Sequence, residues 1–311
     1  MENNNIYNFT LEVDKEDRVD KLLSNYFLEY SRSTIQKWIS TNNVKIDGNL
    51  CSQKDKVKKN CHVSINISTK PEVNLIAEEI AIDIIDESDD YIIVNKPSGM
   101  VTHIAPGNYN GTLQNALFYK YPELADVPRT GIIHRLDKDT SGILVISRNL
   151  ISHNYLSKQL QDRKFKKKYH AIVSGIIDSS MRIEEPIARH PVDRKKMAVS
   201  SKGRFACSII KPLKFYENTS HVEVDIITGR THQIRVHMAY KKHPIIGDRL
   251  YGFKKNIFVK SHNILNSINF SFGQYLHAHS LSFADPKTNV IKTYSAPYPK
   301  DYQLLLDVIS G

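Results

Sequence analysis

The feature that most constrains this chain is a charged loop between apolar residues near its middle. Ile132-Ile133 leads into His134-Arg135-Leu136-Asp137, a Thr-Ser-Gly turn follows, and a β-branched run occupies residues 143–146. This order predicts a strand, an exposed loop and a second strand. Rigid sheets commonly carry reactive groups on such short loops, so Asp137 is a candidate reactive carboxylate. The alternative is a solvated turn, which is the commoner meaning of an arbitrary charged loop.

A chain of 311 residues is long enough for two domains. The N-terminal part predicts two amphipathic helices, the first beginning near Arg18 and the second capped by Ser31. Two alternating stretches, 44–48 and 62–67, predict strands after them. We therefore expect a first domain over residues 1–70, a linker over residues 71–81, which contains Pro71, and a second domain over residues 82–311.

The second domain has many strand-like runs and few helical ones. Strands are expected at 82–85, 91–94, 132–133, 143–146, 171–173 and 222–227, and helices at 113–119 and 150–160. This content predicts an α+β protein, in which helices flank a mixed, mainly antiparallel sheet and a small α/β domain precedes it.

The charge of the chain points to a polyanionic partner. The formal net charge is +10 and the isoelectric point is near 9.3. The sequence shows neither a basic amphipathic helix for a lipid surface nor an apolar run of membrane-spanning length, so nucleic acid is the preferred partner. The polar N-terminus is unlike a signal peptide, and we expect a cytoplasmic protein. Cys51, Cys61 and Cys207 are scattered and odd in number, which disfavours both a disulfide framework and a zinc site.

The motif His134-Arg135-Leu136-Asp137 with its Thr-Ser-Gly turn resembles the catalytic signature of the RluA-type pseudouridine synthases, which isomerise uridine in RNA. The Asn-Lys-Pro-Ser-Gly turn at residues 95–99 is also typical of them, and its role is open between lining a cleft and a plain turn. Residues 18–67, with Ser31-Arg32-Ser33 opening the second helix, resemble an S4 RNA-binding domain. Residues 121–129 place the resemblance closest to the RluD branch, which acts on large-subunit (23S) ribosomal RNA.

Three catalytic residues follow from these patterns. Arg235 lies between two apolar residues, so its guanidinium needs a buried partner, and Asp137 is the natural candidate. Strand alternation places Lys167, Tyr169 and Ala171 on one face. The resemblance makes Asp137 the reactive carboxylate, which attacks the sugar or removes its C2′ proton, and gives Tyr169 the tasks of stacking on the base and accepting the C5 proton.

The resemblance also implies a set of residues that bind the RNA. Arg135 is expected to insert where the flipped base had been, the alternative being a plain phosphate contact. The other members are His134, Lys167, Arg230 and His232 in the second domain and Arg32 and Lys37 in the first. Residues 1–70 carry eleven Lys and Arg against nine Asp and Glu, so this excess of positive charge is small and a merely solubilising face is the alternative.

The isomerisation changes no oxidation state and loses no group, so we expect no cofactor. His232 and His237 stand five residues apart without a matching carboxylate or cysteine motif, which favours structural histidines over a metal site, and the same holds for His277 and His279. The expected partner is 23S ribosomal RNA or an assembling large subunit, with a monomer as the default. The alternatives are another ribosomal site or transfer RNA, a non-catalytic assembly protein, and a nucleoside hydrolase. The last needs two facing carboxylates, for which Asp137 and Asp139 are a weak pair.

Overall fold

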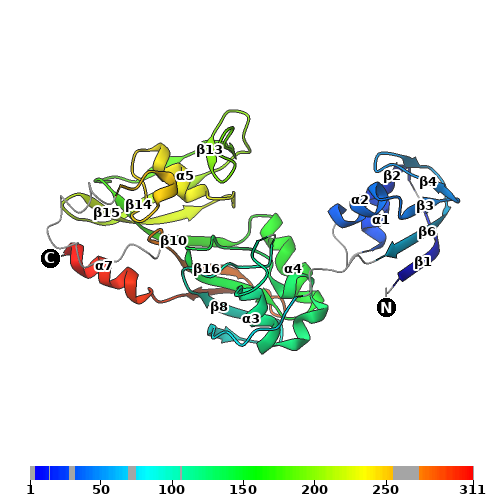
Figure 1. The fold of residues 1–311 in the computed structure, drawn as a ribbon, viewed down its shortest axis with the longest axis horizontal. Helices are drawn as coiled ribbons and strands as arrows, with labels where there is room; N and C mark the ends of the chain where they lie inside the picture. The colour runs from blue at the N-terminus through cyan, green and yellow to red at the C-terminus, as the bar shows by residue number, and fades with distance from the viewer. Residues whose placement is uncertain are drawn as a thin grey trace. The chain divides into compact units, whose positions relative to one another are not determined.

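The computed structural model describes residues 4–13, 15–27, 32–68, 75–105, 107–254 and 273–310. The chain divides into two compact units, residues 1–74 and 75–311 (Figure 1). Ser31, the expected helix cap, and Pro71, in the expected linker, lie outside the described residues.

The first unit packs two helices against a small antiparallel sheet. Its elements are β1 (Asn4–Leu11), β2 (Asp17–Arg18), α1 (Val19–Tyr26), α2 (Arg32–Ser40), β3 (Val44–Ile46), β4 (Asn49–Leu50), β5 (Lys56–Val57) and β6 (Cys61–Ser68). The main sheet has the order β1-β6-β3-β4, and β2 pairs with β5. Both predicted helices and both predicted strands are present.

The strand β1 was not expected from the sequence. Tyr7, Phe9 and Leu11 alternate along it and join the core that Leu23 and Trp38 form with their neighbours. The period-2 signal was therefore present. It lies within a polar N-terminal stretch, which made it easy to overlook.

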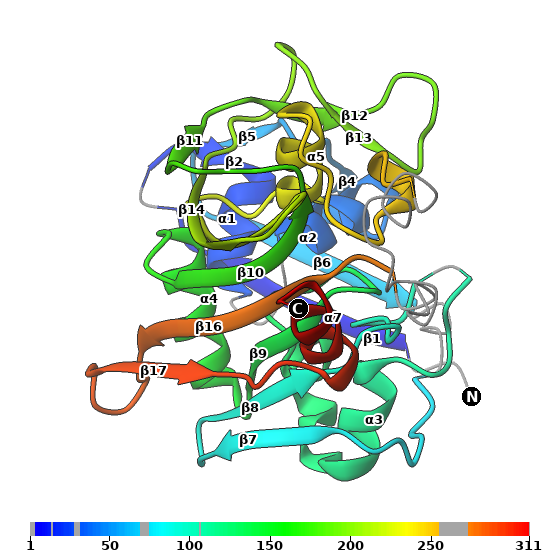
Figure 2. The same ribbon diagram turned by 90° about the vertical axis from the view of Figure 1, so that its left-hand side faces the viewer.

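The second unit is built on a nine-stranded sheet. Its strands are β7 (Asp83–Glu87), β8 (Tyr91–Lys96), β9 (Ser141–Ser147), β10 (Lys166–Ser174), β11 (Met181–Ile183), β14 (Ser208–Phe215), β15 (Thr219–Ile226), β16 (Leu276–Ala284) and β17 (Ile291–Ser295). The order is β11-β14-β15-β10-β16-β9-β8-β7, with β17 also paired to β16. Only the β16–β9 pair is parallel among the described strands. Figure 2 shows β10, β16, β9, β8 and β7 following one another across the sheet.

Helices and a hairpin complete this unit. They are α3 (Leu113–Lys120), α4 (Leu150–Gln161), α5 (Gln233–Tyr240), α7 (Lys300–Ser310) and the hairpin of β12 (Ile187–Arg189) and β13 (Met197–Val199). Tyr169 and Ala171 of β10 belong to the main core with α3 and α4, whereas Ile172 packs in a second core with α7. The two faces of β10 therefore meet different helices. The predicted α+β class and the mixed, mainly antiparallel sheet are confirmed.

The strand expected at Ile132-Ile133 is wrong. A 3-10 turn over Pro128–Gly131 precedes it, and Arg129, Thr130 and Gly131 have left-handed backbones with φ of 54°, 55° and 76°. Ile132 makes only an isolated bridge with Ile146. The backbone enters the charged loop from a tight turn, because three successive left-handed residues cannot continue an extended strand. Only the strand after the loop, β9, is formed.

Within the described ranges of both units, the helices are too short and too polar to cross a lipid bilayer.

Candidate active site

A cleft of about 530 Å³ in the second unit collects the residues that the sequence singled out there. It lies between the charged loop before β9, the start of β10 and the turn that leads from β15 into α5. The predicted site residues that line it are His134, Arg135, Asp137, Lys167, Tyr169, Arg230, His232 and Arg235. Segments far apart in the sequence thus form one site.

A buried lysine, Lys96, anchors the loop that carries Asp137. The Nζ atom of Lys96 donates to the carbonyl oxygens of Pro97, Met100 and Lys138 at 2.8, 2.8 and 3.0 Å. Burial lowers the pKa of Lys96 to about 7, against the opposing effect of Asp139 and Asp137. Three carbonyl acceptors match the three hydrogens of an ammonium group. The turn at residues 95–99 is therefore a clamp on the loop rather than part of the cleft wall.

Two further contacts fix the loop. The Thr102 hydroxyl donates to the carbonyl oxygen of Leu136 at 2.8 Å and accepts from its N–H at 3.3 Å. Gly142 follows the loop with φ of +113°, and a Cβ atom there would lie 2.3 Å from the carbonyl oxygen of Ala278. Only glycine permits β9 and β16 to approach so closely at this point.

Asp137 belongs to a network of two carboxylates and one guanidinium. Arg235 donates from Nη1 to Oδ2 of Asp137 at 3.0 Å, as predicted from its apolar neighbours. Its Nε and Nη2 atoms donate to Asp248 at 2.7 and 3.0 Å. Burial alone lowers the pKa of Arg235, but Asp248 and Asp137 outweigh it and raise that pKa above its ordinary value. Arg235 is thus a permanent charge, held by Asp248 and directed at Asp137.

Tyr169 and Lys167 project from β10 into the cleft, as strand alternation predicted. Burial, with a contribution from Asp137, raises the pKa of Tyr169 well above its ordinary value. The neutral phenol is therefore the favoured form in the free site. Burial lowers the pKa of Lys167 to about 8, and within the described parts of the chain no acidic side chain pairs with it. Lys168 points elsewhere and pairs with Glu223 at 2.9 Å.

The two basic residues of the signature differ in their contacts. His134 accepts the N–H of Val145 at 3.2 Å through Nε2, so it joins the loop to β9 while lining the cleft. Arg135 is exposed, and its Nη1 lies 3.2 Å from Nε2 of His103. Arg135 is therefore the signature residue that is free to meet a substrate.

Arginines gather at the rim of the cleft. Arg163, Arg204 and Arg230 all line it, and burial together with the charges of Arg204 and Arg163 lowers the pKa of Arg230. Arg230 also donates from Nε to the carbonyl oxygen of Phe205 at 3.0 Å. These arginines form no ion pair with the residues that the structure describes, and such an accumulation of cations around a cleft is suited to a polyanion.

Of the histidines considered as metal ligands, His237 and His277 have hydrogen-bond partners, whereas Nδ1 of His279 is buried without one among the described residues. His237 contacts the Ser208 hydroxyl at 2.9 Å and the carbonyl oxygen of Glu185 at 3.0 Å. His277 contacts Ser141 at 2.9 Å, and the described residues hold no group of three or more side chains able to bind a metal ion.

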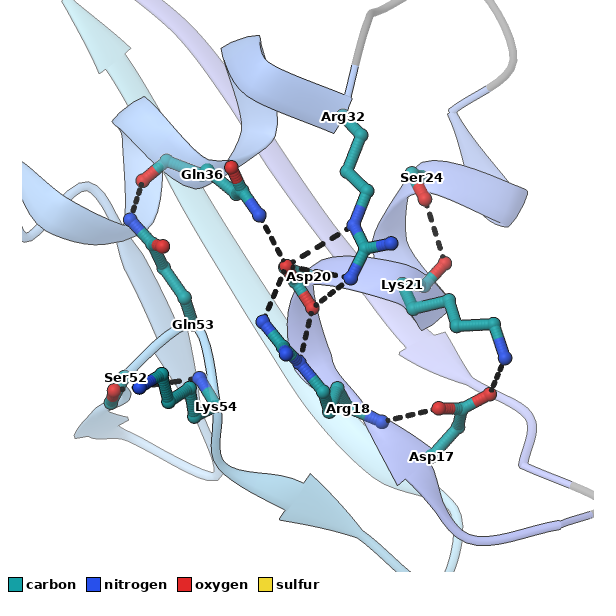
Figure 3. A network of polar contacts seen from close by, with 10 residues as sticks. All are labelled: Asp17, Arg18, Asp20, Lys21, Ser24, Arg32, Gln36, Ser52, Gln53 and Lys54. Atoms are coloured by element: carbon teal, nitrogen blue, oxygen red, sulfur yellow. Dashed lines mark hydrogen bonds and ion pairs between the residues drawn. The ribbon is translucent and has the colours of Figure 1, made fainter. Parts of the chain in front are cut away.

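The first unit presents a second charged site, built around Asp20 (Figure 3). This buried carboxylate accepts from Nε and Nη2 of Arg18 at 3.1 and 3.0 Å, from Nε and Nη2 of Arg32 at 3.2 and 3.0 Å, and from Gln36 at 2.6 Å. The Nη1 groups of both arginines make no hydrogen bond to any part of the chain that the structure describes. The side-chain amide of Gln53 in turn donates to the main-chain carbonyl oxygen of Gln36 at 2.9 Å.

The predicted lysine Lys37 is exposed and lies outside the Asp20 network, as do Lys56 and Lys58. Lys37 is in the last turn of α2. Lys56 and Lys58 share Glu16 at 3.3 and 3.6 Å, so part of their charge is compensated within the unit. Arg32 is thus the better candidate for contact with a phosphate.

The sequence analysis missed three residues of these sites. Asp248 received no role, although a buried arginine such as Arg235 can hold two carboxylates, which was a possible signal. Arg18 was predicted only to lie at the beginning of the first helix, and its contact with Asp20 was not expected. Arg204 carried no signal, because its place at the cleft depends on the turn after β13.

The chain matches the family model for RNA pseudouridylate synthase over residues 90–240 and the S4 domain model over residues 17–61. It is 38% identical over 293 residues to the ribosomal large subunit pseudouridine synthase D of Pseudomonas aeruginosa, covering 94% of this chain and 92% of that protein. The same enzyme of Buchnera aphidicola is 40% identical over 293 residues, with 93% of both chains covered.

Two solved human structures are similar in fold to nearly three quarters of this chain. RNA Pseudouridylate Synthase Domain Containing 1 has a TM-score of 0.56 at 25% identity and covers 72% of this chain and 86% of its own. RNA Pseudouridylate Synthase Domain Containing 4 has a TM-score of 0.60 at 22% identity, with coverage of 73% and 93%.

Proposed function

Since this chain belongs to the RNA pseudouridylate synthase family, we propose that it converts specific uridines of large-subunit (23S) ribosomal RNA into pseudouridine. The observation that carries this proposal is the carboxylate of Asp137, held by Arg235 on one oxygen inside a cleft rimmed by arginines. The relatives described above are named as pseudouridine synthases of the large ribosomal subunit. The S4 domain adds a second RNA-binding unit.

The reaction breaks the N1–C1′ bond, turns the uracil and joins C5 to C1′. Atoms and electrons balance within the nucleotide, so the chain has to supply only a base or nucleophile, proton acceptors and a dry site. Asp137 serves as the nucleophile at C1′ or as the base at C2′. Arg235 keeps a positive charge beside the carboxylate and fixes its orientation.

A uridine in a stacked helix cannot reach Asp137, so it must flip out at a cost of a few kcal/mol. Arg135 is exposed beside the cleft and takes the vacated position in the stack. Tyr169 packs against the flipped uracil and accepts its C5 proton, while Lys167, Arg230, His232 and His134 line the pocket around the nucleotide.

The first unit adds RNA affinity through Arg32 and Lys37. We further propose that the substrate is ribosomal RNA or an assembling large subunit, and that the protein works as a monomer in the cytoplasm. The division into a catalytic domain and an S4 domain, with a linker at residues 71–81, is part of the same proposal.

The test is a pseudouridine map of large-subunit ribosomal RNA by carbodiimide labelling and primer extension. Cells with the wild-type protein, with none and with Asp137→Asn are compared. We expect the same sites to vanish in the last two, while purified Asp137→Asn folds normally and binds the RNA. The substitution keeps size and hydrogen bonding but removes the charge that either mechanism needs.

Other outcomes separate the alternatives. An unchanged map would exclude large-subunit RNA, and transfer RNA is then mapped in the same way. Release of free uracil would indicate a hydrolase, and tight binding without product on authentic RNA would indicate an assembly protein. Residual turnover by Asp137→Asn would remove Asp137 from its role.

A further inference from the structure

His232 lies between the catalytic loop and a tyrosine that the reaction does not use directly. It is the residue before α5 and has a left-handed backbone, with φ of 56°. Its Nδ1 is 2.7 Å from the hydroxyl of Tyr251, and its Nε2 is 3.8 Å from Oδ2 of Asp137. The imidazole therefore joins Tyr251 to the reactive carboxylate.

The contacts of Tyr251 decide which ring nitrogen carries the proton. The Met197 N–H donates to the Tyr251 oxygen at 2.8 Å, so the hydroxyl hydrogen is free to be given to Nδ1 of His232. With Nδ1 as an acceptor, the proton of a neutral imidazole is on Nε2. The opposite tautomer would direct a nitrogen lone pair at the carboxylate of Asp137, which electrostatics disfavours. Burial lowers the pKa of His232, so the ring is neutral near pH 7.

The two oxygens of Asp137 are not equivalent. Oδ2 receives Nη1 of Arg235 at 3.0 Å and faces Nε2 of His232. Oδ1 accepts no hydrogen bond from any residue that the structure describes. Hydrogen bonds of a free active site are often long and shorten when substrate binds, so the 3.8 Å approach of His232 is suited to closing on Oδ2.

We propose that Tyr251 and His232 are positioning residues that hold Oδ2 of Asp137 and reserve Oδ1 for the reacting sugar. Tyr251 contacts both groups that hold Oδ2, because its ring centroid is also 4.9 Å from Cζ of Arg235. Its N–H further contacts Oδ1 of Asp248 at 3.3 Å. One tyrosine thereby fixes the imidazole through its hydroxyl and the guanidinium through its ring. The proposal rests on the function proposed above for Asp137.

Tyr251→Phe separates the two contacts of this residue. It keeps the ring beside Arg235 and removes only the hydroxyl that directs His232. We expect kcat to fall about 10- to 100-fold, as for other groups that orient a catalytic side chain, with KM within about twofold. Tyr240→Phe is the control, because Tyr240 is exposed at the end of α5 and also loses just a hydroxyl.

Two substitutions of His232 test the proton itself. Asn tolerates the left-handed backbone but is too short to reach Asp137, so His232→Asn should lower kcat at least as far as Tyr251→Phe. His232→Gln places an N–H near the position of Nε2 and should recover part of the loss. If both variants fold equally well and kcat of His232→Gln is no higher than that of His232→Asn, the proposed role of His232 as a donor to Asp137 is contradicted.

The tautomer is measured without any turnover, by ¹⁵N correlation spectra of the histidine rings in the full-length protein. The spectrum of His232→Asn identifies the missing signal among the 13 histidines. We expect an Nε2–H tautomer in the wild type. In Tyr251→Phe we expect a larger share of Nδ1–H, because no hydroxyl donates to Nδ1 and only the carboxylate of Asp137 still favours Nε2–H. An Nδ1–H tautomer in the wild type, or a Tyr251→Phe protein with unchanged tautomer and kcat, overturns the proposal. This spectrum decides the tautomer even if the wild type makes no pseudouridine.

Discussion

Each unit of this protein contains a network of carboxylates and guanidiniums built on a buried charge, and these two networks have opposite composition. In the first unit, one carboxylate, Asp20, gathers two guanidiniums. Its side chain is 0% exposed, while those of Arg18 and Arg32 are 38% and 46% exposed. In the second unit, one buried guanidinium gathers two carboxylates, of which Asp248 is 1% and Asp137 is 21% exposed.

The comparison shows how a buried charge can determine what an exposed neighbour does. The buried residue of each network is paired with oppositely charged neighbours, whose positions it fixes. Because there are two such neighbours for one buried charge, the excess charge lies on the more exposed residues. In the first unit the surplus is positive and is suited to a phosphate. In the second unit it is negative and is available for chemistry on a sugar. Under the proposed function, the same type of contact thus serves binding in one unit and catalysis in the other.

Among substitutions that leave Asp137 itself intact, the largest effect is expected from Arg235→Lys in the second unit. Lysine keeps the charge, but a single ammonium cannot make the three directed contacts to Asp248 and Asp137. We expect kcat to fall by at least about 100-fold, with RNA affinity unchanged, because the loss concerns the orientation of the carboxylate. Single-turnover kinetics and filter binding on the same RNA measure the two quantities.

Arg182→Lys is the matched control, since Arg182 forms an exposed ion pair with Glu184 in the same unit. It should leave kcat unchanged. If Arg235→Lys retains wild-type turnover, a positive charge at this position is sufficient. The claim that the directed hydrogen bonds of Arg235 orient Asp137 would then be wrong.

The Asp137–Arg235 pair could be predicted from the sequence because a guanidinium between Ile234 and Val236 needs a buried partner, and a carboxylate in a loop signature was at hand. The Asp20 network could not be predicted in this way. Arg18, Asp20 and Arg32 were visible, but helical spacing does not say which charge becomes fully buried, since this depends on how α1 and α2 cross. The mixed, mainly antiparallel sheet of the second unit could be predicted, because short apolar runs recur along its sequence.

The path into the catalytic loop was predicted wrongly for a related reason. Ile132-Ile133 has the composition of a strand, yet the left-handed backbones of Arg129 and Thr130 exclude it. Neither residue type favours that conformation, so the fold imposes it and local sequence gives no warning. Tertiary packing decides both cases, which is why the second carboxylate Asp248 was also overlooked.

The next effect in size is expected from Asp20→Asn in the first unit. The neutral amide leaves two neighbouring guanidiniums without their shared counter-charge. The free energy of unfolding of this unit should fall by about 1–3 kcal/mol. Trp38 is the only tryptophan of the chain and is buried in this unit, so its fluorescence during urea unfolding of the full-length protein follows this unit alone.

Asp17→Asn is the control, because Asp17 pairs with Lys21 near the surface and should lose less stability. Acid gives an independent check. Burial by itself raises the pKa of Asp20, but the hydrogen bonds from Gln36, Arg32 and Arg18 outweigh it and lower that pKa below its usual 3.8. The stabilisation is thus present above that value and is lost as pH falls through the lowered pKa. A wild-type protein that loses no more stability than Asp20→Asn over this range would contradict the network.

The smallest effect is expected from Arg32→Gln, which tests whether the exposed guanidinium meets RNA. Glutamine can still donate to Asp20 but carries no charge, so unfolding of the unit should change little. Affinity for a large-subunit RNA fragment should fall a few-fold, and the slope of log K against log salt should decrease by about one. Lys56→Gln removes the same charge from a residue that Glu16 already compensates, and its slope should change less. Equal slopes for the two variants would mean that the first unit attracts RNA by net charge alone. A distinct loss at Arg32 would instead show that the buried carboxylate directs the arginine to a phosphate, just as Arg235 directs Asp137.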